Sequence, residues 1–347
     1  MHRNNRLTVV ARFKNCVVHA YADLGLICSR KNGLFLIKDL ANPRMEPIAS
    51  IPWKFLQQLA HIRLLDRYLK FSILQVHKTQ ELGYLASTGH SWWHISYDGA
   101  VSNVAHFPNT QPMKRGICES KTGITYVAEY LSNQERNPVR IFRSTNLEQF
   151  DVAWEFGSKS IRHIHALIVD PEMKNRIWVL TGDWDNESGF FFTDDDFGSL
   201  QCYLMRGQQT RATDVILRDG SLYWGMDSPS KTSFILRASK DQPDIIEELC
   251  ELPGPAYYMG QNQAGGMYLA TTVERGPGVK DKVGHMFGTK PDGSWEEIMT
   301  AKKDYFPQFG IFYFPRGVLP ENFVVFSQRA LKPFEGYLTI ARDRLWP

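Results

Sequence analysis

Two histidines and a few carboxylates have the types and spacing that could carry out chemistry. His163 and His165 are two residues apart in an apolar, strand-like stretch, so both imidazoles would lie on the same face of a strand. This spacing can supply two ligands to a metal ion, with Asp183, Asp227 or Glu274 as the third. The candidate metal ligands are His163, His165 and Asp183, and a divalent ion is the candidate cofactor. The alternative is that one imidazole only hydrogen-bonds a backbone carbonyl.

Two acid–base chemistries fit the same region. Asp227 and Glu274 could serve as the paired carboxyl groups of a glycosidase. A lyase acting on a uronate would instead use an imidazole base, a tyrosine acid and the Arg211 guanidinium, which suits a carboxylate. The sequence leaves hydrolysis and elimination open. The predicted catalytic residues are His163, His165, Arg211, Asp227, Tyr258 and Glu274.

A repeated strand-and-turn pattern must position these residues. Strand-like residues lead to an Asp or Asn, often followed by Gly, and then to another strand-like stretch. These Asp or Asn residues, which we call the marks, recur at intervals of about 45 to 59 residues. Such a spacing is typical of a β-propeller with one four-stranded blade per repeat. The seven marks are Asp39, Asp98, Asn146, Asp196, Asp241, Asp292 and Asp343.

The two ends of the chain favour seven blades over the alternative of six. The last repeat stops near Asp343, which leaves it without an outer strand, and the chain begins with a surplus strand at 7–13. Pairing of that strand into the last blade would remove an exposed sheet edge. We therefore expect an all-β protein, a single propeller domain over 1–347, with a short helical insertion near 52–66.

The loop after the second strand of every blade opens on the same mouth of a propeller, and an ionisable residue stands there in each repeat. These residues are Arg30, His90, Glu129, Asp183, Asp227, Glu274 and Arg329. Trp184 and Trp224 flank the same region and could stack on a sugar ring. The predicted substrate-binding residues are His90, Glu129, Asp183, Trp184, Trp224, Tyr257 and Arg329.

The repeat resembles the Asp-box, or BNR repeat, of sialidase-like propellers and of bacterial proteins similar to glycosyl hydrolases. Asp194-Asp195-Asp196-Phe197-Gly198 is the best copy, with Asp in place of the usual Ser, and Asp292-Gly293-Ser294-Trp295 keeps the turn and the aromatic residue. The resemblance implies a structural role, in which a short carboxylate caps turn amides while an aromatic side chain packs between blades. The Arg-Ile-Pro motif and the arginine triad of sialidases are missing.

The charge and the hydropathy of the sequence limit which partners and which location we expect. The 347 residues carry a net charge of +3 with no basic run, so nucleic acid is not expected. No segment is long and apolar enough to be a leader or a membrane span, so we expect a cytoplasmic protein. The leading hypothesis is a carbohydrate-active enzyme, either a glycoside hydrolase or a polysaccharide lyase, acting on an acidic or hydroxyl-rich glycan. The alternatives are a non-catalytic propeller that binds a glycan or a protein, and a metal-dependent enzyme of other chemistry.

Overall fold

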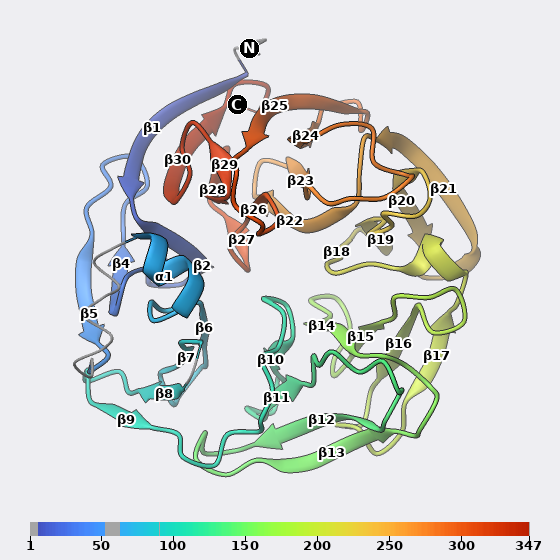
Figure 1. Cartoon of the computed structure of the whole chain (residues 1–347), viewed down its shortest axis with the longest axis horizontal. Helices are drawn as coiled ribbons and strands as arrows, with labels where there is room; N and C mark the ends of the chain where they lie inside the picture. The colour runs from blue at the N-terminus through green and yellow to red at the C-terminus, as the bar shows by residue number, and fades with distance from the viewer. Residues whose placement is uncertain (1–5, 53–62, 90, 347) are drawn as a thin grey trace. The chain divides into compact units, whose positions relative to one another are not determined.

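The computed structural model describes residues 6–52, 63–89 and 91–346. Almost all regular structure in these ranges is β-strand, in seven sheets that are the blades of a seven-bladed β-propeller (Figure 1). The predicted all-β propeller is thus confirmed. The chain divides into two compact units, one of residues 1–105, 260–270 and 283–347 and the other of residues 106–259 and 271–282. The single-domain prediction over 1–347 stays a prediction.

The first unit contains blades one, two and seven and most of blade six. Blade one is β2 (Cys16–Ala22), β3 (Gly25–Arg30), β4 (Gly33–Ile37) and β5 (Glu46–Ser50), and blade two is β6 (Gln75–Lys78), β7 (Tyr84–Ser87), β8 (Trp92–Ile95) and β9 (Val101–Asn103). Blade six is β22 (Ala256–Asn262), β23 (Met267–Thr271), β24 (Val283–Thr289) and β25 (Trp295–Lys303), with short edge strands β27 (Val318–Leu319) and β29 (Leu331–Lys332). Blade seven is β26 (Ile311–Tyr313), β28 (Phe323–Arg329), β30 (Tyr337–Asp343) and β1 (Leu7–Lys14).

Blade seven is completed by the N-terminal strand, as predicted. Strand β1 pairs antiparallel with β30 from Leu7 opposite Asp343 to Lys14 opposite Tyr337. The buried Arg6 guanidinium anchors this end of the pairing, because its Nε and Nη2 donate to the Asp343 carboxylate at 2.6 to 2.9 Å. Tyr268 donates a further hydrogen bond to Asp343 at 2.8 Å. We call Arg6, Tyr268 and Asp343 the clasp.

The helical prediction lies mostly outside the described residues, because 53–62 are not among them. The one α-helix in the described ranges is α1 (Arg63–Leu69), which overlaps the end of the predicted segment 52–66. No helix in the described part of the chain is long and apolar enough to cross a membrane.

The second unit contains blades three, four and five in chain order (Figure 1). Blade three is β10 (Ile117–Glu119), β11 (Thr125–Ala128), β12 (Val139–Ser144) and β13 (Asp151–Phe156). Blade four is β14 (Ile164–Val169), β15 (Ile177–Thr181), β16 (Gly189–Thr193) and β17 (Gln201–Leu204). Blade five is β18 (Ile216–Arg218), β19 (Ser221–Gly225), β20 (Ser233–Ser239) and β21 (Gln242–Leu252), and the 3₁₀ helix η2 (Gly207–Thr210) precedes it.

Strand β15 shows why these blades stack. All five of its residues are buried, so the strand lacks the polar face of a half-exposed sheet. Successive side chains point to opposite faces. Trp178 and Leu180 therefore join the core shared with blade five, whereas Ile177 and Val179 join the core shared with blade three. Blade four is thus fixed from both sides, which makes it a rigid support for the loops at its strand ends.

The turn between β16 and β17 matches the physical role expected of an Asp-box, shifted by one residue. Thr193 takes the place assigned to Asp194, and Asp195 takes that of Asp196: the Thr193 hydroxyl donates to Asp195 at 2.9 Å, and the amide of Ser199 donates to the same carboxylate oxygen at 2.9 Å. Phe197 is buried and its ring lies 4.8 Å from that of Tyr126 in blade three. The turn is therefore structural.

Candidate functional site

The predicted histidines meet at the start of blade four. His165 lies on β14, and His163 directly precedes the strand; their Nε2 atoms are 3.1 Å apart, and both side chains are almost fully buried. His163 Nδ1 faces the carbonyl of Leu131 at 3.1 Å, and His165 Nδ1 faces that of Ala212 at 3.0 Å. A carbonyl only accepts hydrogen bonds, so each Nδ1 carries the proton and each Nε2 offers a lone pair.

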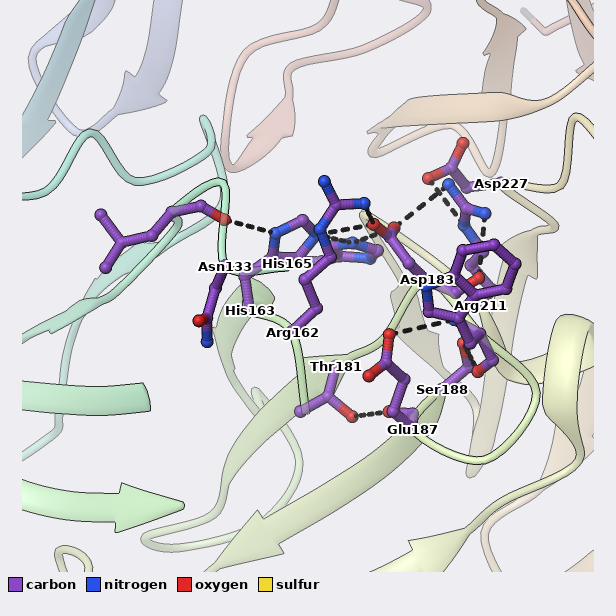
Figure 2. A network of polar contacts seen from close by, with 12 residues as sticks. Asn133, Arg162, His163, His165, Thr181, Asp183, Glu187, Ser188, Arg211 and Asp227 are labelled. Atoms are coloured by element: carbon purple, nitrogen blue, oxygen red, sulfur yellow. Dashed lines mark hydrogen bonds and ion pairs between the residues drawn. The ribbon is translucent and has the colours of Figure 1, made fainter. Parts of the chain in front are cut away.

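Asp183 lies at the centre of the polar network (Figure 2). One carboxylate oxygen lies 3.4 Å from His163 Nε2, and the other lies 3.4 Å from His165 Nε2. Two guanidinium groups hold the same carboxylate, from Arg162 at 2.7 Å and from Arg211 at 3.2 Å. Burial lowers the pKa of His165 more than the Asp183 carboxylate raises it.

A glycine aims Asp183 at the histidines. Gly182 follows β15 with a φ of +132°, and a Cβ atom there would lie 2.3 Å from Ser188 Oγ and 2.5 Å from Ser188 Cα. Only glycine fits this turn without strain. The loop beyond it is closed by the Glu187 carboxylate, which pairs with Arg136 at 2.9 and 3.2 Å. Of the acidic residues in this loop, Glu187 therefore has a structural partner, and the exposed Asp185 pairs with Lys231 at 3.3 Å.

Arg211 links Asp183 to Asp227 (Figure 2), whose carboxyl group interacts electrostatically with that of Glu274. Its Nε lies 3.4 Å from an Asp227 oxygen, and its side chain is only 15% exposed. Burial raises the pKa of Asp227 well above its usual value despite the attraction of Arg211, and the charge of Glu274 adds to the rise. Burial likewise raises the pKa of Glu274, although a hydrogen bond with Tyr257 opposes the rise. Burial and these two carboxyl groups raise the pKa of Tyr257.

Several polar atoms of this second group lack partners. Among the described residues, Asp227 Oδ1, Glu274 Oε1 and Arg211 Nε are buried without a hydrogen-bond partner of good geometry. Buried polar atoms in folded proteins are almost always paired, so each exception calls for a functional or structural reason. Perturbed pKa values beside such atoms are typical of functional sites.

The structure brings together His163, His165, Asp183, Arg211, Asp227, Tyr257 and Glu274, all of which belong to the second unit. It places Tyr258 elsewhere. The Tyr258 ring is buried 5.5 Å from the Arg115 guanidinium, which pairs with Asp214 at 2.7 Å. Tyr257 rather than Tyr258 therefore lies among the carboxyl groups. The catalytic roles themselves stay predictions.

Two predicted substrate-binding residues of the second unit, Trp224 and Glu129, are not in this group. Trp224 is fully buried, packs against Phe190 and donates to the Gln209 carbonyl at 2.7 Å, so its faces are covered and the predicted sugar stacking is ruled out. Glu129 is buried and accepts the Arg140 amide at 2.7 Å. Arg329 belongs to the first unit, where it lies 3.4 Å from the Tyr313 hydroxyl. His90 lies outside the described residues. Trp184, by contrast, is 60% exposed beside Asp183.

The sequence analysis missed Tyr130 as a neighbour of the imidazoles and assigned no site role to Arg162. The Tyr130 ring stacks on His163 with centroids 4.2 Å apart, and Arg162 binds Asp183 as described above. Tyr130 directly follows Glu129, the residue predicted at the end of the second strand of blade three. A search that included the next residue would have identified it. Arg162 directly precedes His163 and was visible as an entry residue of blade four.

Comparisons with known proteins show the fold. No protein-family profile matches the chain, and no curated protein matches it in sequence. Among solved structures, a catalytically inactive variant of virginiamycin B lyase from Staphylococcus aureus, determined with quinupristin, is similar over 97% of this chain and 98% of its own, with 11% identity and a TM-score of 0.58.

Two further structures are similar. A protein from Lactobacillus plantarum matches 91% of this chain and 88% of its own at 13% identity and a TM-score of 0.52. A prolyl endopeptidase matches 94% of this chain at 10% identity and a TM-score of 0.53, and the similarity spans 47% of that longer chain. These likenesses support a β-propeller. The specific resemblance to sialidase-like Asp-box proteins stays a prediction.

Proposed function

We propose that this protein is a carbohydrate-active enzyme in which Asp227 and Glu274 act as a paired proton donor and acceptor. The observation that carries the proposal is the pair of carboxyl groups itself: each has a raised pKa and a buried oxygen without a partner in the described part of the chain. Burial and the mutual repulsion of the two carboxyl groups favour the protonated form of one of them. A donor and an acceptor are then available together, as glycoside hydrolysis requires.

The surroundings of the pair suit an oxygen-rich, acidic substrate. Arg211 contacts both Asp183 and Asp227 and remains 15% exposed, so part of its guanidinium can receive a carboxylate from a ligand. Trp184 presents an exposed indole next to Asp183, and aromatic faces of this kind pack against apolar ring faces. The resemblance of the repeats to Asp-boxes agrees with a saccharide ligand. Hydroxyl groups of a sugar would satisfy the unpartnered oxygens of Asp227 and Glu274.

Elimination is the second candidate, and Tyr257 favours it. The Tyr257 hydroxyl interacts with Glu274 and lies in the field of Arg211, so a phenol, a carboxyl group and a guanidinium are grouped as a uronate lyase would need. The imidazoles fit this role less well, because both Nε2 atoms face Asp183 and both rings are buried.

The test is product analysis with purified protein and a panel of acidic and neutral oligosaccharides. A new reducing end without ultraviolet absorbance indicates hydrolysis, whereas an unsaturated, absorbing product indicates elimination. We expect Asp227→Asn and Glu274→Gln each to lower kcat/KM by about 100- to 10,000-fold. Asp219→Asn is the matched control, because this carboxylate is 86% exposed and belongs to the same blade as Asp227. Saccharide binding without turnover, or full activity in both variants, would contradict the proposal.

A further inference from the structure

We infer that His163, His165 and Asp183 form a binding site for one divalent first-row transition-metal ion, bound through the two Nε2 atoms and the carboxylate. The inference does not depend on the proposed acid–base chemistry, because metal binding can be measured without any substrate. It rests on the direction of the lone pairs, the spacing of the donor atoms and the way that the donors are held.

The lone pairs converge. Both imidazoles donate their Nδ1 protons to backbone carbonyls, of Leu131 and Ala212, so neither ring can turn its Nε2 into a donor without losing its neutral form. The two Nε2 atoms nevertheless face each other at 3.1 Å, and each faces an Asp183 oxygen at 3.4 Å. Three acceptors in contact repel one another unless a positive charge lies between them. A metal ion supplies that charge.

The spacing fits coordination. Donor atoms around a tetrahedral ion with bonds of about 2.0–2.1 Å are roughly 3.3 Å apart. The two Nε2 atoms are 3.1 Å apart, and each lies 3.4 Å from a different oxygen of Asp183, so the carboxylate faces both imidazoles. One donor atom from each of the three residues lies within 4.8 Å of the other two. Two nitrogens and one carboxylate leave at least one coordination position open, which is the ligand count of catalytic rather than structural metal sites.

The donors are also held as metal ligands usually are. The Nδ1–H bonds to backbone carbonyls fix the tautomer and the ring orientation, and Tyr130 stacks on His163. Arg162 and Arg211 fix the Asp183 carboxylate at 2.7 and 3.2 Å. These two positive charges mean that a bound dication would leave an excess of positive charge, so the open position would favour an anionic ligand group.

The experiment uses the chelator-treated protein, titrated with Zn²⁺ by calorimetry and with Co²⁺ by visible absorption. We expect one equivalent per chain and a Co²⁺ spectrum typical of nitrogen and oxygen ligands. His163→Asn and His165→Asn keep an N–H donor near the position of Nδ1 but lose the Nε2 ligand, so each should weaken binding by at least about 100-fold. Asp183→Asn should do the same.

His285→Asn is the matched control. His285 also pairs with a carboxylate, Glu297, at 2.5 Å, but through Nδ1 and outside the His163–His165–Asp183 group. This variant should bind one equivalent as tightly as the unmodified protein. Urea unfolding checks that each variant is folded. The inference is overturned if the unmodified, folded protein takes up no stoichiometric Zn²⁺ or Co²⁺, or if folded His163→Asn and His165→Asn bind these ions as tightly as it does.

Discussion

The clasp in the first unit and the carboxyl group pair in the second contain the same types of side chain, namely arginine, tyrosine and carboxyl groups. They differ in how many of their carboxyl oxygens have hydrogen-bond partners. In the clasp, Arg6 and Tyr268 donate to Asp343, and the Leu345 amide adds a bond at 3.0 Å, so both carboxylate oxygens are satisfied. Around Arg211, one oxygen of Asp227 and one of Glu274 remain without partners among the described residues. A fully hydrogen-bonded buried network stabilises the fold, whereas the unpartnered oxygens beside Arg211 leave acceptors available to a ligand.

The largest effect is expected from breaking the clasp. Asp343→Asn removes the charge that Arg6 requires and leaves a buried guanidinium with weakened partners. Losing one member of a buried pair costs about 3–5 kcal/mol of unfolding free energy. Urea unfolding measures this loss. Asp244→Asn is the control, because Asp244 pairs with Arg206 at the surface and is 80% exposed. If Asp343→Asn lowers the unfolding free energy by less than about 1 kcal/mol, the clasp is not the stabilising buried network described here.

A smaller effect is expected at the turn that aims Asp183. Gly182→Ala forces a Cβ atom into Ser188 on a backbone that L residues rarely adopt, which should cost about 1–3 kcal/mol. Gly220→Ala is the control, because Gly220 also has a positive φ, of +67°, but a Cβ atom there would have no other atom within 4 Å. The excess loss in Gly182→Ala measures the clash, and loss of activity should accompany it. Equal losses in both variants would contradict this explanation of how Asp183 is positioned.

The smallest effect has the opposite sign. The pKa of Asp227 is raised in the folded protein, by burial and by the charges of Glu274 and Asp183 against the attraction of Arg211. The folded state therefore binds more protons than the unfolded state between the two pKa values, and the unfolding free energy falls as the pH rises through that window. Asn carries no charge, so Asp227→Asn should match the unmodified protein near pH 4 and exceed its stability at pH 8 by about 1–2 kcal/mol.

Urea unfolding at both pH values measures that gain. Asp219→Asn should show no such difference between the two pH values, because Asp219 is exposed. A variant Asp227→Asn that is less stable than the unmodified protein at pH 8 would mean that the carboxylate is stabilising there, as it is in the clasp.

Much of the fold could be predicted from the sequence because propeller repeats are local. The repeated strand-and-turn pattern predicted the propeller and its number of blades, and the surplus strand at the N-terminus predicted its partner in blade seven. The predicted register of the turn after β16 differs by one residue from the observed one, because a side-chain oxygen is followed two residues later by a carboxylate both at Thr193 and at Asp194. The local pattern does not separate the two.

The histidines and carboxyl groups of the site could be identified from the sequence, but its aromatic residues could not. Tyr257 and Tyr258 are adjacent on a strand, so they point to opposite faces, and the sequence does not say which face carries the carboxyl groups. Trp224 follows the same logic, since its strand position faces the core shared with blade four. Long-range packing decides these cases, and it is absent from any single repeat.

A carboxyl titration by ¹³C NMR in chelator-treated protein, with assignments from Asp227→Asn and Glu274→Gln, measures the protonation of the pair itself. We expect Asp227 and Glu274 to titrate together at pH values clearly above those of ordinary carboxyl groups, which lie near about 4. Titration of both groups at or below that ordinary value would contradict the proposed donor–acceptor pair, because both carboxyl groups would then be ionised, satisfied and no different in kind from the clasp.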